Sequence, residues 1–137
     1  MKSIATKFFA TGAVFALGGM VWGIQMSATH DHTLSPAHGH LNLIGFVAMS
    51  VFGAYYALTP RAAAARLALV HYLLTVMTVL ILTPGIALAI IGETEVLAKL
   101  GSVLAVLSMA LFTYVVLRNG VGAAEAGAGC AHAQPAE

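Results

Sequence analysis

Side chains that can bind a metal are concentrated in one short stretch of the chain, just before a long apolar run. Five of them lie within eleven residues: His30, Asp31, His32, His38 and His40. Imidazole and carboxylate groups together suit Zn²⁺, Cu²⁺ or Ni²⁺. One hypothesis is therefore a divalent-metal site, with Cu or Zn as its ion. The alternative is a solvated interfacial turn, in which Asp31 bonds amides of the loop and caps the helix that follows.

The elements that position these residues are membrane-spanning helices. The chain has 137 residues, of which 60% are hydrophobic and 8% charged, and its mean hydropathy is +0.92. A helix needs about 20 apolar residues to cross a bilayer. Four segments qualify, at about residues 8–26, 36–58, 67–91 and 96–117. We therefore predict an all-α integral membrane protein, with one up-down four-helix bundle over residues 1–118 and a disordered Ala/Gly-rich tail over residues 119–137.

Composition and motifs exclude several classes of function. A net charge of +1 provides no basic surface for nucleic acid. The single cysteine, Cys130, excludes an internal disulfide, and the sequence contains no CxxC pair, no phosphate-binding loop and no HExxH motif. No catalytic residue is predicted.

The basic residues predict the orientation in the membrane. With four spans, five of the six fall on one side: Lys2, Lys7, Arg61, Arg66 and Arg118. Lys99 lies on the other side, where it can pair with Glu93 or Glu95. Cytoplasmic loops carry an excess of Lys and Arg. We therefore expect a multi-pass protein of a bacterial inner membrane, with both termini cytoplasmic and the histidine-rich loop periplasmic.

The first span has an alternative reading as a cleaved signal peptide, because it follows a basic start. However, four small residues align on one side of the helix: Gly12, Ala16, Gly19 and Gly23. Such a stripe lets another helix approach closely. We therefore expect this span to be retained, with Trp22 as a membrane-interface anchor.

At 100° per residue the second span divides into two faces. A polar-and-small face is expected to point inward, and consists of His38, Asn42, Gly45, Met49, Gly53 and Tyr56. An aliphatic face is expected to point to lipid or a partner, and consists of His40, Ile44, Val47, Val51, Ala54 and Leu58. Histidines at i and i+2 of a helix point apart and would serve different partners. If the helix begins after His40, both histidines belong to the loop. Asn42 is expected to bond an imidazole or a backbone group across the interior of the bundle, and to fix the tautomer of His38 if that residue is a ligand.

The stretch "AHGHLNLIGFVAMSVFGAYYALTP" resembles the H-x-H helix of the heme–copper oxidase superfamily, particularly its nitric oxide reductase branch. The chain is also similar to stand-alone four-span proteins described as oxidase-subunit-I-like. The resemblance implies that His38 and His40 are haem-iron ligands, the first to a high-spin and the second to a low-spin haem. The cofactor implied is haem b.

The chain departs from the oxidase subunit in ways that bear on its activity. That subunit has about twelve spans and further histidines for a copper or non-haem iron site, whereas this chain has one other intramembrane histidine, His71. Oxygen or nitric oxide reduction by this chain alone is therefore not expected. The leading hypothesis is a b-type haem protein for electron transfer, gas sensing or haem handling. The alternatives are a cofactor-free accessory or assembly subunit of a respiratory complex, and an outer-face divalent-metal binder.

His71 is not expected to complete a haem with His40 of the same chain. At 1.5 Å per residue the two differ in depth by roughly 15–20 Å, and two axial ligands of one iron need the same depth. A parallel homodimer through the second span would instead bring two copies of His40 together. We expect His71 to point inward and to bond Tyr55, Tyr56 or a threonine.

Overall fold

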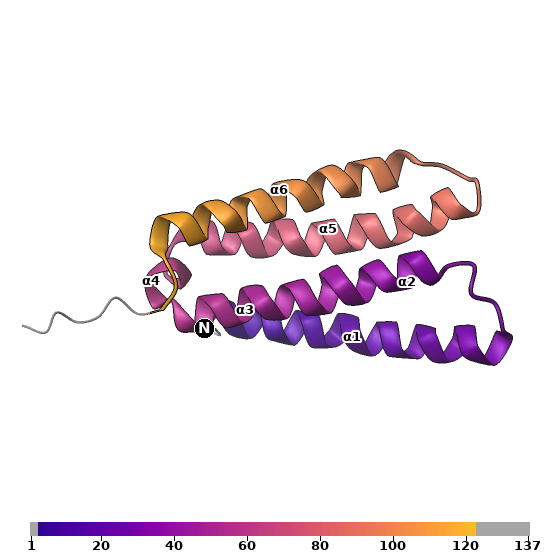
Figure 1. The fold of residues 1–137 in the computed structure, drawn as a ribbon, viewed down its shortest axis with the longest axis horizontal. Helices are drawn as coiled ribbons and strands as arrows, with labels where there is room; N and C mark the ends of the chain where they lie inside the picture. Colours follow the sequence, from indigo (N-terminus) through magenta and orange to yellow (C-terminus); the bar gives the residue numbers. More distant parts are fainter. Residues whose placement is uncertain (1–2, 123–137) are drawn as a thin grey trace, which may run out of the picture.

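The computed structural model describes residues 3–122, which form helices joined by short connections and contain no strand. Four helical stretches are long and apolar enough to cross a membrane, so the chain is a multi-pass membrane protein (Figure 1). Three are the helix α1 (Ile4–Thr29), the helix α5 (Arg66–Ile90) and the helix α6 (Val96–Asn119). The other span runs through α2 (Ser35–Asn42), the wide π-helical turn η1 (Leu43–Ala48) and α3 (Met49–Leu58). The predicted first and last residues of each span lie within four residues of the observed ones.

Short connections join these helices. After α1, His30 adopts the left-handed conformation with φ of 56°, which ends the helix. The connection after α3 contains the short helix α4 (Pro60–Ala63), which begins at a proline. Gly92 follows α5 with φ of 82°, a conformation that suits glycine. The helix α5 continues through Pro84.

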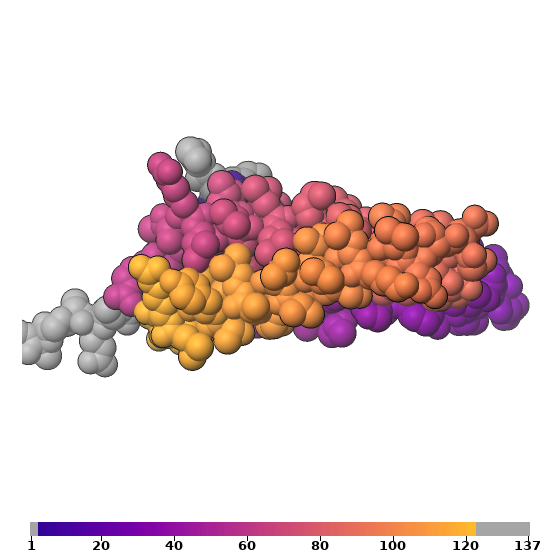
Figure 2. Space-filling model, turned by 90° about the horizontal axis from the view of Figure 1, so that it is seen from above, coloured from indigo at the N-terminus to yellow at the C-terminus, as the bar shows by residue number. Residues whose placement is uncertain are grey.

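The helices form two antiparallel hairpins, one from α1 with α2–η1–α3 and one from α5 with α6 (Figure 1). The second span and α1 both contact α5, whereas α6 packs chiefly on α5. Figure 2 shows α6 lying along one long face of the molecule. The beginning of α1 and the end of α6 lie at the same end as α4, and both hairpin loops lie at the opposite end.

Small residues set the closest helix contacts. Gly12, Ala16 and Gly19 of α1 are buried, which confirms the predicted close-packing face. In the second hairpin, a Cβ at Gly101 would lie 2.6 Å from the Leu82 Cα. The two helices of each hairpin can therefore approach until their backbones nearly touch.

The predicted tail begins inside the described part of the chain. Asn119 is the last residue of α6, and the Gly120 carbonyl accepts a hydrogen bond of 2.9 Å from the Tyr55 hydroxyl. The Gly122 amide donates to Thr59 Oγ1 at 3.1 Å. Residues 123–137, with Cys130, lie outside the described residues, and so does the prediction of disorder there.

Candidate functional site

Both histidines of the H-x-H stretch are helical, because α2 begins before them at Ser35, with Pro36 in its first turn. Proline is accepted there since the first amides of a helix have no partner. His38 and His40 therefore point in different directions, as expected for positions i and i+2. The alternative in which both belong to the loop is excluded.

His40 lies on the exposed side of the second span, as the sequence predicted. Its Nδ1 lies 2.8 Å from the Pro36 carbonyl oxygen. A carbonyl oxygen can only accept, so Nδ1 donates and carries a proton. In the tautomer with one proton, the lone pair is on Nε2, at the far side of the ring. This arrangement, with Nδ1 as a donor to a backbone carbonyl and Nε2 pointing outward, is the one that histidine ligands of iron and other metals adopt.

His38 is half-buried and is bound by Asn42, four residues later. The Asn42 Nδ2 donates to the His38 carbonyl at 3.0 Å and lies 3.2 Å from His38 Nε2. Nε2 therefore accepts, and the proton is on Nδ1, which is buried without a hydrogen-bond partner among the described residues. Asn42 thus bonds an imidazole and a backbone group, as predicted, but both belong to its own helix and not to a partner across the interior. For His38 to bind iron through Nε2, Asn42 would have to move away.

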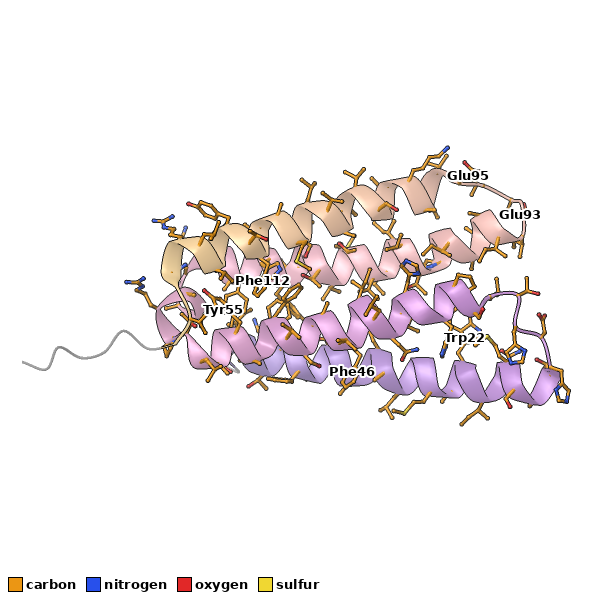
Figure 3. All side chains as sticks on the ribbon, viewed as in Figure 1. Trp22, Phe46, Tyr55, Glu93, Glu95 and Phe112 are labelled. Atoms are coloured by element: carbon orange, nitrogen blue, oxygen red, sulfur yellow. The ribbon has the colours of Figure 1, made fainter. Side chains whose placement is uncertain are left out.

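The first span forms the other side of this pair. The Trp22 ring packs edge-on against the His38 ring, with 6.0 Å between centroids, and lies near the loop end of the bundle (Figure 3). A Cβ at Gly23 would lie 3.2 Å from His38 Cε1, and one at Gly19 would overlap the Asn42 amide. The small residues of α1 therefore make the room that these two polar side chains occupy.

The loop between the first two spans is organised by its own hydrogen bonds. Asp31 Oδ1 accepts from the Thr33 amide at 3.0 Å, and hydrogen bonding with Thr33 lowers the pKa of Asp31 below its usual 3.8. The predicted bond to a loop amide is thus confirmed. The predicted helix cap is wrong, because Leu34 is the N-cap of α2 and no side chain caps it. Asp31 uses its carboxylate for the turn that precedes the cap position.

The metal hypothesis required several of the five loop side chains to converge. Over residues 3–122, no group of three or more His, Cys, Asp or Glu residues is arranged to hold a metal ion. His30 and His32 are both exposed, and His38 and His40 diverge on α2. The divalent-metal site stays a prediction.

The space between the hairpins does not suit a porphyrin. A cavity of about 110 Å³ lies there, lined by Thr75, Thr78 and Ser108 on one side and by Ile44 and Phe52 on the other. Pockets for ligands of drug size have about 300–1,000 Å³. This cavity is therefore too small for a porphyrin, and His40 presents Nε2 on the outward face of the second span.

His71 is fully buried and makes the contact predicted from the sequence. Its Nδ1 lies 3.0 Å from the Tyr56 hydroxyl. Thr75, in contrast, donates to the His71 carbonyl at 2.8 Å and not to the ring. His71 Nε2 is buried and has no hydrogen-bond partner in the described part of the chain.

Aromatic side chains from three spans surround His71. This aromatic cluster consists of Phe8, Phe52, Tyr55, Tyr56 and Phe112, with His71 at its centre. Tyr55 and Phe112 lie near the end that carries α4 (Figure 3). The sequence reasoning missed the cluster. A signal existed for Phe8, which lies four residues before Gly12 and so extends the stripe of small residues on α1.

His40 and His71 lie near opposite ends of the bundle. His40 is five residues after the start of α2, next to the two hairpin loops, whereas His71 is five residues after the start of α5, next to α4. This placement agrees with the expectation that one chain cannot offer both to one iron.

No protein-family model, curated protein or solved structure matches this chain.

Proposed function

We propose that this chain is a membrane protein that holds b-type haem through His40, on the face of the second span that points away from the other helices. The observation that carries the proposal is the 2.8 Å contact between His40 Nδ1 and the Pro36 carbonyl. It fixes the ring orientation and leaves the Nε2 lone pair outward. A hydrogen bond of this kind orients histidine ligands in metal and haem sites.

The resemblance of "AHGHLNLIGF" to the H-x-H helix of heme–copper oxidases supports the same assignment. In that family the second histidine of the pair binds the low-spin haem, which corresponds by position to His40. His38 departs from the family role, because Asn42 engages its Nε2. We assign His38 and Asn42 to holding the second span against α1. Without further histidine ligands, the chain is proposed as an electron-transfer, gas-sensing or haem-handling protein and not as a reductase.

The second axial ligand is proposed to be His40 of another copy. A parallel two-fold dimer brings equivalent residues to the same depth across its axis. On the same side of the second span as His40, the apolar side chains of Leu43, Val47 and Val51 are exposed. They form an apolar surface against which a porphyrin can pack. Haem b held by two histidines supplies one-electron transfer.

The distribution of Lys and Arg supports the orientation. The basic residues of the described chain lie mainly at the end that carries α4, and His40 lies toward the other end. By the positive-inside rule, the proposed haem side faces the periplasm of a bacterial inner membrane.

The test is a reduced-minus-oxidised optical spectrum of the detergent-purified protein with a pyridine haemochrome assay. Wild type is expected to show a low-spin b-type spectrum. His40→Ala is expected to lose it, while the matched variant His38→Ala retains it. A spectrum that survives in His40→Ala and disappears in His38→Ala would reverse the ligand assignment.

Two further outcomes contradict parts of the proposal. A high-spin spectrum, or a monomer that keeps low-spin haem, would exclude the shared-ligand dimer. A colourless protein after expression with ample haem would exclude haem binding, and loss of bound Cu or Zn on chelation from that protein would favour the divalent-metal alternative.

A further inference from the structure

A pocket of about 480 Å³ lies at the end of the molecule opposite the histidine loop. It is formed where α4 and the start of α5 meet the last turn of α6. Its lining combines the apolar residues Ala65, Leu67 and Val115 with the arginines Arg61 and Arg118. Figure 2 shows the end of α6 beside the segment that carries α4. The pocket is therefore apolar along the helices and cationic at their ends.

Each of the two guanidinium groups makes one hydrogen bond within the chain. Arg61 Nη2 donates to the Asn119 carbonyl at 3.3 Å. Arg118 Nη1 donates to the Tyr114 hydroxyl at 3.0 Å, and its guanidinium carbon lies 6.0 Å from the centre of that ring. A guanidinium has five N–H donors. Each arginine is thus positioned by one bond and has further donors for an acceptor in the pocket.

No carboxylate of the described residues lies near this pocket. The acidic residues of the described part of the chain are Asp31, Glu93 and Glu95, and all three lie in the two loops at the other end of the molecule. Glu95 pairs with Lys99 at 2.8 Å. Arg66 adds a third guanidinium at the α4 end, outside the pocket lining. The charge of Arg61 and Arg118 is therefore not balanced by the described part of the chain.

We infer that this pocket binds the phosphate of an anionic phospholipid, with Arg61 and Arg118 as the donors to the phosphate oxygens. Arginine binds phosphate in a bidentate way. A basic pocket between helices at the membrane surface is a site for lipid headgroups. The apolar wall of Leu67 and Val115 lies beside the arginines. A phospholipid can therefore place its phosphate at the arginines and its acyl chains against the apolar wall.

The experiment is native mass spectrometry of the full-length protein in detergent, with phosphatidylglycerol or phosphatidylcholine of the same acyl chains. Phosphatidylglycerol is expected to bind in preference. A hydrogen bond to a charged group contributes a factor of about ten in affinity. Arg61→Gln and Arg118→Gln each remove such bonds to the phosphate and are expected to lower phosphatidylglycerol occupancy about ten-fold. Arg66→Gln is the matched control, and its occupancy is expected to stay within two-fold of wild type.

A second variant keeps the inference testable if an arginine variant unfolds, which circular dichroism reports. Ala65→Trp fills the pocket without changing any charge and is expected to abolish the preference for phosphatidylglycerol. Equal losses in Arg66→Gln and Arg61→Gln would overturn the site in favour of a diffuse basic surface. Displacement of the lipid by millimolar inorganic phosphate would overturn the lipid assignment and identify a site for free phosphate.

Discussion

Asn42 lies between Gly19 of the first span and His38 of its own span. Its amide therefore limits which residue can stand at position 19 and which atom of His38 is free to bind a ligand. Its amide binds both the carbonyl and the Nε2 of His38. A Cβ at Gly19 would occupy the same space as that amide. An amide in a membrane span must be paired, so the missing side chain at Gly19 is what allows Asn42 to pair locally.

The first prediction concerns Gly19. In Gly19→Ala the new methyl group displaces the Asn42 amide, which then loses its bonds to His38. The free energy of unfolding is expected to fall by about 1–2 kcal/mol. Gly18→Ala is the control, because nothing lies within 4 Å of its added Cβ and both variants gain the same helix propensity. Unfolding in mixed detergent measures both. Equal stabilities would show that Asn42 repairs its bonds elsewhere.

The second prediction concerns the buried pair of Tyr56 and His71. In Tyr56→Phe the His71 ring keeps its place in the aromatic cluster but has no hydrogen-bond partner at either nitrogen among the described residues. A loss of about 1 kcal/mol in unfolding free energy is expected. Tyr114→Phe, which alters an exposed tyrosine, is expected to change stability by less than half as much. A tolerated Tyr56→Phe would mean that the hydroxyl adds nothing beyond packing.

These two polar pairs could be predicted from the sequence for simple geometric reasons. Asn42 follows His38 by four residues, which places them on one helix face. Tyr56 and His71 lie at similar distances from the same connection, so their depths agree. The aromatic cluster could not be predicted in the same way. The cluster depends on the rotation of α6 about its own axis, which turns Phe112 toward His71. Because α6 is almost uniformly apolar, its sequence has no hydrophobic periodicity that predicts this rotation.

At the scale of elements, the second span is the most informative helix. Its predicted inward residues Gly45, Met49 and Gly53 are buried, and its predicted outward residues Val47 and Val51 are exposed. The prediction is wrong for Ile44, which lines the cavity between the hairpins. The wide turn η1 was not predicted, because its sequence LIGFVA contains no proline and is ordinary for a membrane helix. Such turns occur mostly as single-turn insertions within helices and are frequent at functional sites. Phe52 and Tyr55 are buried as well, since α3 contacts Phe8 on one side and Phe112 on the other.

The third prediction concerns the hairpin of α5 and α6. A methyl group in Gly101→Ala would lie 2.6 Å from the Leu82 Cα, and backbone atoms cannot move aside by rotation of a side chain. The two helices must separate, at a cost of about 1–3 kcal/mol. Since α6 packs chiefly on α5, amide hydrogen exchange is expected to rise in α6 and to stay unchanged in α1.

Ser102→Ala is the matched control for this hairpin. Ser102 is exposed and its hydroxyl bonds only the Ala98 carbonyl of its own helix. Its hydrogen exchange is expected to match wild type. Faster exchange throughout Gly101→Ala, including α1, would show instead that the four spans unfold as one cooperative unit.

At the scale of the whole molecule, charge is separated along the bundle. All described acidic residues lie in the two hairpin loops at the end that carries His30, His32 and His40, and Arg61, Arg66 and Arg118 lie at the other end. The four spans could be predicted because a lipid-exposed backbone has to be helical and apolar over a fixed length. How the hairpins pack could not, because lipid-facing and protein-facing apolar residues are alike in type.

The fourth prediction is the orientation in the membrane. In a Cys130→Ser background, Thr33→Cys places a thiol in the histidine loop and Ala64→Cys places one beside α4. Both positions are exposed. By the positive-inside rule, a membrane-impermeant maleimide is expected to label Cys at position 33 in intact bacterial cells and Cys at position 64 only in inverted vesicles. The reverse pattern would place the histidines on the cytoplasmic side.

The aromatic cluster also has a consequence for biogenesis. Phe8 and Phe52 belong to the first hairpin, whereas His71 and Phe112 belong to the second. Each hairpin satisfies its own backbone hydrogen bonds and can enter the bilayer before the other is synthesised. The His71 ring is then without Tyr56 until the hairpins meet. When the two hairpins associate, the His71 ring leaves the lipid and pairs with Tyr56. This hydrogen bond favours the associated state over the separate hairpins.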